Sequence, residues 1–190
     1  PTGAFGPLRP REPAAARRLV ETIGPALRGL LADDGNRLRI VSFDDSEAAL
    51  ALAAGEQGAE AAAGGPLTPD QIVYCASFPL WFDPPEGAPP EELVERLREA
   101  VQGHETRTHD RPRVVLVRGL GLFAAGDTTA AADTVRKVYL DAIRVMAGAA
   151  RLGGIRPLGP AQRAFIEQWE VEAYRRRVAA GTGPAAVGLH

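Results

Sequence analysis

The chain of 190 residues has little of several residue types that build functional sites. It contains one Cys, one Met and three His, and all but one of its 22 basic residues are arginine, the exception being Lys137. The single Cys, Cys75, excludes an internal disulfide and any site that needs several thiolate ligands. A chain without a disulfide framework is typical of a reducing, intracellular setting, so we expect a cytoplasmic protein.

Two further absences restrict the partners. The 22 basic and 24 acidic residues give a formal charge of -2, so we expect no net basic surface for nucleic acid or an anionic membrane. No run of 18 apolar residues occurs, and the N-terminus lacks a basic-then-apolar pattern, which argues against a membrane span and a secretion signal. We therefore expect neither nucleic acid nor a membrane as a partner.

Composition also divides the chain into three parts. The sole Met is Met146 and the first residue is Pro1, so we expect a processed chain or a piece of a longer one. Residues 1–13 are rich in Pro and Gly and are expected to be a linker. Residues 14–178 are expected to form a single α/β domain, and residues 179–190, rich in Gly and Ala, a flexible tail or second linker.

Helices are predicted where a cap or proline precedes apolar residues at helical spacing. They are expected from Pro13, over 47–63, from Pro90, over 127–152 and over 160–177. Short apolar runs between turn residues predict strands. These runs are 38–43, 71–76, 79–82 and 113–117, and for 71–76 and 79–82 an extended segment is the alternative to a strand.

The order of these elements indicates the fold. The run Arg113–Val117 is apolar without alternation, as in a strand buried on both faces of a parallel sheet. Because strands alternate with helices, we expect an α/β fold. The expected architecture is a small parallel or mostly parallel sheet of about four strands, wrapped by helices in a Rossmann-like three-layer arrangement.

A glycine-spaced segment, Gly119–Gly126, follows the last predicted strand and precedes a helix, and it is expected to be a loop. In this position backbone N–H groups and a helix N-terminus can hold an anion. The glycine spacing differs from the dinucleotide fingerprint, and no Gly-Lys-Ser or Gly-Lys-Thr is present. The glycines therefore either permit a tight turn or belong to an anion or sugar-phosphate site. The residues proposed for such a ligand site are Gly119, Gly121, Gly126, Asp127, Thr128 and Asp70.

No catalytic constellation and no metal site is expected from the remaining residues. His104 and His109 lie five apart in a polar stretch and are interpreted as solvated loop histidines. Cys75 lies in an apolar run, where a thiol behaves as a small hydrophobe with a raised pKa. Thr68 is interpreted as an N-cap or turn residue, with a place at a loop mouth as the alternative. Trp169 is either a core residue or part of a helix that docks a neighbouring domain.

Four segments resemble the middle region of bifunctional rhamnulose-1-phosphate aldolase/short-chain dehydrogenase proteins, which are related to class II aldolases and adducin. They are LRGLL at 27–31, LTPDQIV at 67–73, PRVVLVRGLGLFAAGDT at 112–128 and FIEQWEVEAYR at 165–175. The resemblance implies a class II aldolase domain before this region and a nicotinamide-dependent dehydrogenase domain after it. It implies that zinc and NAD bind in those flanking domains, and that this domain holds no cofactor.

The same resemblance identifies departures from an active enzyme. Class II aldolases hold zinc through an early His-x-His and a later His-Gly, but this chain has no His-x-His, and Leu120 stands at the later position. The usual Thr-Pro-Asp-His is Thr68-Pro69-Asp70-Gln71 here, and the dehydrogenase Tyr-x-x-x-Lys pair is absent. We therefore expect a non-catalytic domain that positions the flanking domains, its partners, or assembles protomers into a homo-oligomer. An anion-binding module is the alternative.

Overall fold

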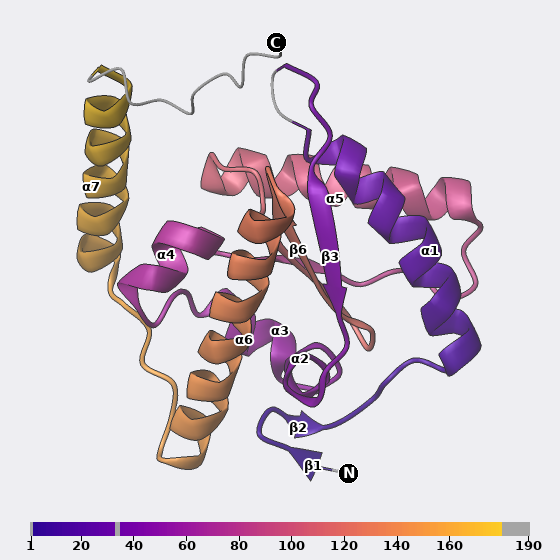
Figure 1. Cartoon of the computed structure of the whole chain (residues 1–190). Coiled ribbons are helices and arrows are strands. Elements are labelled where there is room, and N and C mark those ends of the chain that lie inside the picture. Colours follow the sequence, from indigo (N-terminus) through magenta and orange to yellow (C-terminus); the bar gives the residue numbers. More distant parts are fainter. Residues whose placement is uncertain (1, 33–34, 180–190) are drawn as a thin grey trace.

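The central feature of the fold is a four-stranded sheet (Figure 1). The computed structural model describes residues 2–32 and 35–179, with the backbone alone for Thr2 and residues 170–179. The strands lie in the order β3 (Ile40–Asp44), β6 (Gly121–Gly126), β5 (Val114–Val117) and β4 (Leu80–Phe82). The helices are α1 (Pro13–Leu30), α2 (Glu47–Ala53), α3 (Gly58–Ala63), α4 (Pro69–Cys75), α5 (Pro90–Thr108), α6 (Thr129–Arg151) and α7 (Pro160–Ala179). The α/β class and a sheet of about four strands are confirmed, although only three of the four predicted strands, 38–43, 79–82 and 113–117, correspond to strands of this sheet.

The sheet is mixed, which corrects the expected parallel or mostly parallel pairing. β4 pairs with β5 in parallel, but β6 is antiparallel to both β5 and β3. The cause is segment 119–126, which is not a loop, since most of it is strand β6. Gly119 and Gly121, with φ of 73° and 138°, let the chain reverse directly after β5, and three residues are too few for a parallel crossover. A Rossmann-like arrangement is not confirmed.

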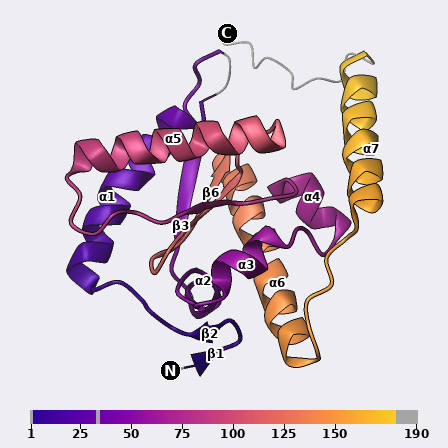
Figure 2. The ribbon, with the colours of Figure 1, turned by 180° about the vertical axis from the view of Figure 1, so that it is seen from behind.

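Alternate residues of β5 and β6 enter two hydrophobic cores, one on each face of the sheet. Leu116 and Leu122 pack among residues of α2, α4 and α6 on one face. Val115 and Phe123 pack among residues of α1 and α5 on the other face. Figure 2 shows these two helices from behind, with α5 passing in front of the strands. All four residues of β5 are buried, as the apolar run 113–117 predicts.

The first residues of the chain pack onto the domain. β1 (Thr2–Gly3) and β2 (Gly6–Pro7) form a hairpin whose Phe5 is 2% exposed. Gln57 N–H donates to the Phe5 carbonyl at 2.9 Å, in the break between α2 and α3. A Cβ on residue 55 would lie 2.8 Å from the Phe5 Cβ, so the absence of a side chain at Gly55 leaves room for the hairpin. The segment expected as a linker thus contributes to the core, and the single helix predicted over 47–63 is two helices.

The strand predicted over 71–76 is wrong, because these residues form most of α4. Thr68 Oγ1 accepts a hydrogen bond from the Gln71 N–H at 3.2 Å, and Gln71 Oε1 accepts one from the Leu67 N–H at 3.0 Å. This arrangement is close to a capping box, which satisfies N–H groups at a helix start. The N-cap interpretation of Thr68 is therefore confirmed.

The last helix, α7, packs beside α4 at the edge of the domain (Figures 1 and 2). Apart from residue 179, which ends α7, the expected tail of residues 179–190 lies outside the described residues. Within the part of the chain that the structure describes, no helix is long and apolar enough to cross a membrane.

The reversal after β5 makes a first prediction about stability. A Cβ on Gly121 would lie 2.4 Å from the Asp44 carbonyl oxygen, at a φ that L side chains avoid. We expect Gly121→Ala to lower the free energy of unfolding by about 3 kcal/mol or more. Gly148→Ala is the matched control, because nothing lies within 4 Å of its Cβ position inside α6. It should stabilise by about 0.5–1 kcal/mol in urea unfolding. Equal stabilities for the two variants would contradict this account of the turn.

Candidate functional site

The residues proposed for an anion site do not form one site. Gly119 and Gly121 lie at the turn between β5 and β6, whereas Gly126, Asp127 and Thr128 lie at the far end of β6. Five residue steps along a strand separate Gly121 from Gly126 by roughly 17 Å. The strand therefore divides the proposed set into two groups.

At the glycine turn, the backbone polar groups already have partners within the protein. The Gly119 N–H donates to the Ala53 carbonyl at 2.8 Å, and the Gly119 carbonyl accepts from the Arg11 N–H at 2.8 Å. The Leu120 N–H donates to the Val117 carbonyl at 3.0 Å. These groups are not available to an anion, so the geometry favours the interpretation of Gly119 and Gly121 as turn glycines.

The other group borders a cavity of about 460 Å³ whose lining includes Arg39, Tyr74, Arg113, Gly126 and Asp127. Arg39 pairs with Asp127, and its Nε donates to the carbonyl of Leu31, just past the end of α1, at 3.0 Å. Arg113 donates at 2.6 Å to a carbonyl in the last turn of α4. Carbonyls at helix ends lack partners within the helix, and these arginines supply them. An anion in this cavity would have to compete with Asp127 and with the helix ends.

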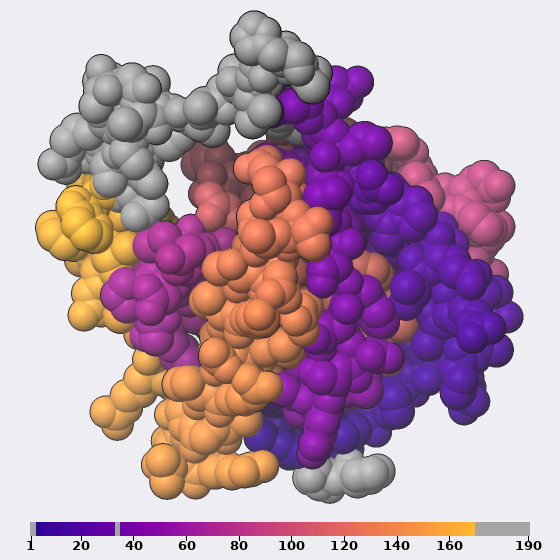
Figure 3. Space-filling view, viewed as in Figure 1, coloured from indigo at the N-terminus to yellow at the C-terminus, as the bar shows by residue number. Residues whose placement is uncertain are grey.

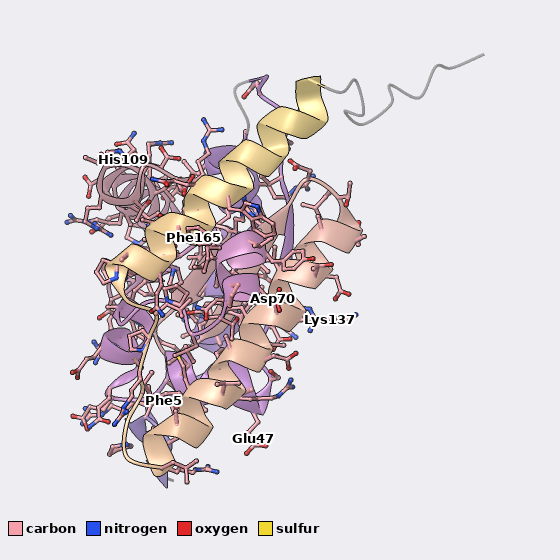
Figure 4. The ribbon with its side chains drawn as sticks, turned by 90° about the vertical axis from the view of Figure 1, so that its left-hand side faces the viewer. Phe5, Glu47, Asp70, His109, Lys137 and Phe165 are labelled. Atoms are coloured by element: carbon pink, nitrogen blue, oxygen red, sulfur yellow. The ribbon has the colours of Figure 1, made fainter. Side chains whose placement is uncertain are left out.

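Thr128 and Asp70 act at the starts of helices. Thr128 Oγ1 accepts from the Ala131 N–H at 3.1 Å and so caps α6, as the sequence predicts. Asp70 is exposed in the first turn of α4 (Figure 4). It lines neither the cavity of about 460 Å³ nor the surface hollow beside Gly119 and Leu120. The structure therefore does not bring Asp70 together with the glycine segment, and anion binding by these residues stays a prediction.

Leu120, at the position that matches a zinc ligand, is a core residue. Its side chain is 3% exposed and lies in the same apolar cluster as Ile23 and Phe123. Zinc needs nitrogen, sulfur or oxygen ligands, which leucine lacks. Among residues 2–32 and 35–179, no group of three or more His, Cys, Asp or Glu side chains could hold a metal ion. The residues at this position do not fit a zinc site.

A second cavity, of about 270 Å³, was not found by sequence reasoning. It lies between the segment after α4, the end of α5 and the first half of α7, and its lining includes Ser77, His104 and Glu167. Ser77 Oγ donates to Glu167 Oε1 across the gap to α7. These residues are far apart in the sequence, so no spacing pattern could join them.

His104 corrects an expectation from the sequence. It lies inside α5 and is 1% exposed, whereas it was interpreted as a solvated loop residue. Leu93, Leu97, Val101 and His104 are the buried residues of α5 and follow helical spacing, which is the signal that could have placed His104. His109, at the end of α5, is exposed, in line with its interpretation.

Cys75 is a buried residue of α4 whose thiol donates to the Val135 carbonyl at 3.5 Å. Burial raises its pKa to about 12, against a smaller opposing effect of Arg113. Since the thiolate is the reactive form, we expect the folded protein to react with a thiol reagent at pH 8 at least about a thousandfold more slowly than the unfolded chain.

The control for this second prediction is a thiol on the exposed part of α5. Thr106→Cys in a Cys75→Ala background should react rapidly in the folded state, because Thr106 is exposed. Similar rates for Cys75 and for this introduced thiol would show that the core around Cys75 opens readily.

Comparison with known proteins places the chain in a family. Residues 18–175 match the family described as aldolase class II, second domain. A curated relative is the uncharacterized oxidoreductase YuxG of Bacillus subtilis (strain 168), 26% identical over 179 residues that cover 86% of this chain and 26% of the relative. The chain thus spans about a quarter of the length of that relative. Because the family match extends over most of the chain, this protein belongs to the class II aldolase family, in which it is a second domain.

Proposed function

We propose that this domain is non-catalytic and positions the flanking domains of a longer polypeptide through an apolar face of α7. The relative YuxG is about four times as long as the region it shares with this chain and bears the name of an oxidoreductase. In this proposal the longer polypeptide is a cytoplasmic aldolase/short-chain dehydrogenase that acts on rhamnulose 1-phosphate. Zinc and NAD then bind in its flanking domains.

The observation that carries this proposal is a pair of exposed aromatic side chains on α7. Phe165 is 72% exposed and Trp169 is 60% exposed. Four residues apart on a helix, they lie on the same face. Exposed aromatic side chains that are close together are typical of protein–protein interfaces.

The surroundings of the pair support the same interpretation. Tyr74, on the neighbouring helix α4, is 44% exposed. α7 lies at the outer side of the domain, beyond α4, where a further domain can reach it (Figure 3). Phe165 lies on the face of α7 that Figure 4 shows. The flanking domain of the same polypeptide is the occupant that we propose for this face.

The position of Leu120 supports the non-catalytic part of the proposal. A buried leucine cannot replace a histidine that binds zinc, and the turn around it is fixed by hydrogen bonds to Ala53 and Arg11. Restoring a zinc site here would need new ligands and a reorganised core, so an aldol cleavage site is better placed in another domain.

The third prediction tests the aromatic face directly. Hydroxyl-radical footprinting, read by mass spectrometry, is compared between the 190-residue chain and the longer polypeptide. We expect severalfold protection of Phe165 and Trp169 in the longer polypeptide, because burial in an interface excludes the radical. Leu152, which is 90% exposed and lies just after α6, is the control for general shielding.

Three outcomes are possible in this experiment. Protection of the two aromatic residues, but not of Leu152, supports the positioning role. Protection that appears in the 190-residue chain as its concentration rises assigns the face to a second copy, and thus to assembly. Equal labelling in both forms at all concentrations contradicts the proposal.

A further inference from the structure

The cavity of about 270 Å³ behind α7 has a polar floor and a charged rim. The floor includes Ser77, 8% exposed, and His104, 1% exposed. The rim includes Arg107, Asp110, Arg163 and Glu167. Three separate segments of the chain meet here, on the side of the domain where α4, α5 and α7 come together (Figure 2).

His104 is a buried polar side chain that borders the cavity. It is 1% exposed, and its own backbone carbonyl accepts a hydrogen bond from Thr108 Oγ1 at 2.9 Å. Burial lowers the pKa of His104, and the positive charge of Arg107 lowers it further. The negative charge of Asp110 has a smaller, opposing effect. The imidazole is therefore neutral near pH 7, with one nitrogen that donates and one that accepts. Because a buried polar side chain is stabilised by hydrogen bonds, a ligand that can both donate to and accept from the imidazole is favoured at this position.

The Ser77 hydroxyl and the Arg163 guanidinium are held in place at the cavity. Ala76 has φ of 62°, an uncommon conformation for a residue with a side chain, immediately before Ser77. Ser77 donates to Glu167 and keeps its oxygen lone pairs for a further donor. The Arg163 guanidinium lies 5.0 Å from the centre of the Phe78 ring, which restrains its orientation. Hydrogen-bonding groups of several kinds thus face one small space.

The charges of the lining decide which kind of ligand fits. Arg107 and Arg163 are balanced by Asp110 and Glu167, and His104 is neutral, so the cavity has no net attraction for an ion. The arginines donate, the carboxylates accept, and Ser77 and His104 do both. A hydroxyl group also donates and accepts, so several hydroxyls on a neutral carbon chain match this set.

We propose that this cavity binds a small, uncharged, polyhydroxylated molecule, with its hydroxyl groups on His104, Ser77 and the rim of charged side chains. The volume lies just below the roughly 300–1,000 Å³ of pockets for drug-sized ligands, which suits a molecule with about five or six carbon atoms. The site is separate from the position of Leu120 and does not depend on the role proposed for the aromatic face of α7.

The fourth prediction tests this site by NMR on the 190-residue chain. The three histidines give few ring signals, so His104 can be followed during titration with xylitol, ribitol, D-xylose or D-ribose. We expect a saturable shift of the His104 ring signals with at least one of these probes. His109, which does not line the cavity, is the internal control. Inorganic phosphate and malonate should give no saturable shift at His104.

Substitutions separate binding from general effects on the fold. Ser77→Ala should weaken binding of the responding probe about fivefold, as expected for the loss of one neutral hydrogen bond. Thr106→Ala removes a hydroxyl from exposed α5, outside the cavity, and should leave binding unchanged. The proposal is overturned if no polyol or pentose shifts His104, if only the anions do, or if Ser77→Ala binds as tightly as Thr106→Ala.

Discussion

The structure depends on one constraint, the insertion of β6 between β3 and β5. This strand is hydrogen-bonded on both edges and buried on both faces, so it joins the two hydrophobic cores. It can follow β5 directly because Gly119 and Gly121 adopt conformations that favour glycine. The short turn then places Leu120 in the core below α1, and the start of α6 at the opposite end of the strand.

This constraint makes the turn between β5 and β6 part of the core. Leu120, which the sequence resemblance to class II aldolases matches to a zinc ligand, contributes its side chain to the core. The backbone N–H groups of that turn are used within the fold. Polar cavities occur instead at the periphery, at the start of α6 and behind α7. The features available for function therefore lie on surfaces that can face a ligand or another domain.

Local signals predicted much of the fold from the sequence. Helical periodicity and capping residues predicted α1, α5 and α6, and the unbroken apolar run predicted β5, because these patterns reflect which side chains of each segment are buried.

The predictions for two segments were wrong, for different reasons. The run 71–76 is too short for its apolar residues to distinguish a helix from a strand. The signal that indicates a helix is the capping pair of Thr68 and Gln71. The glycines of 119–126 resembled a loop, although Leu122 to Ala125 is an apolar run that the core requires. The cavity at Ser77 and His104 depends on tertiary contacts and has no local signature.

The proposal that this domain is non-catalytic is tested most directly by one assay. The purified 190-residue chain is incubated with zinc, its metal content is measured, and cleavage of a ketose 1-phosphate is followed. The account predicts substoichiometric zinc and no turnover, because Leu120 offers no ligand and is 3% exposed in an apolar cluster. One zinc ion per chain together with turnover would contradict it.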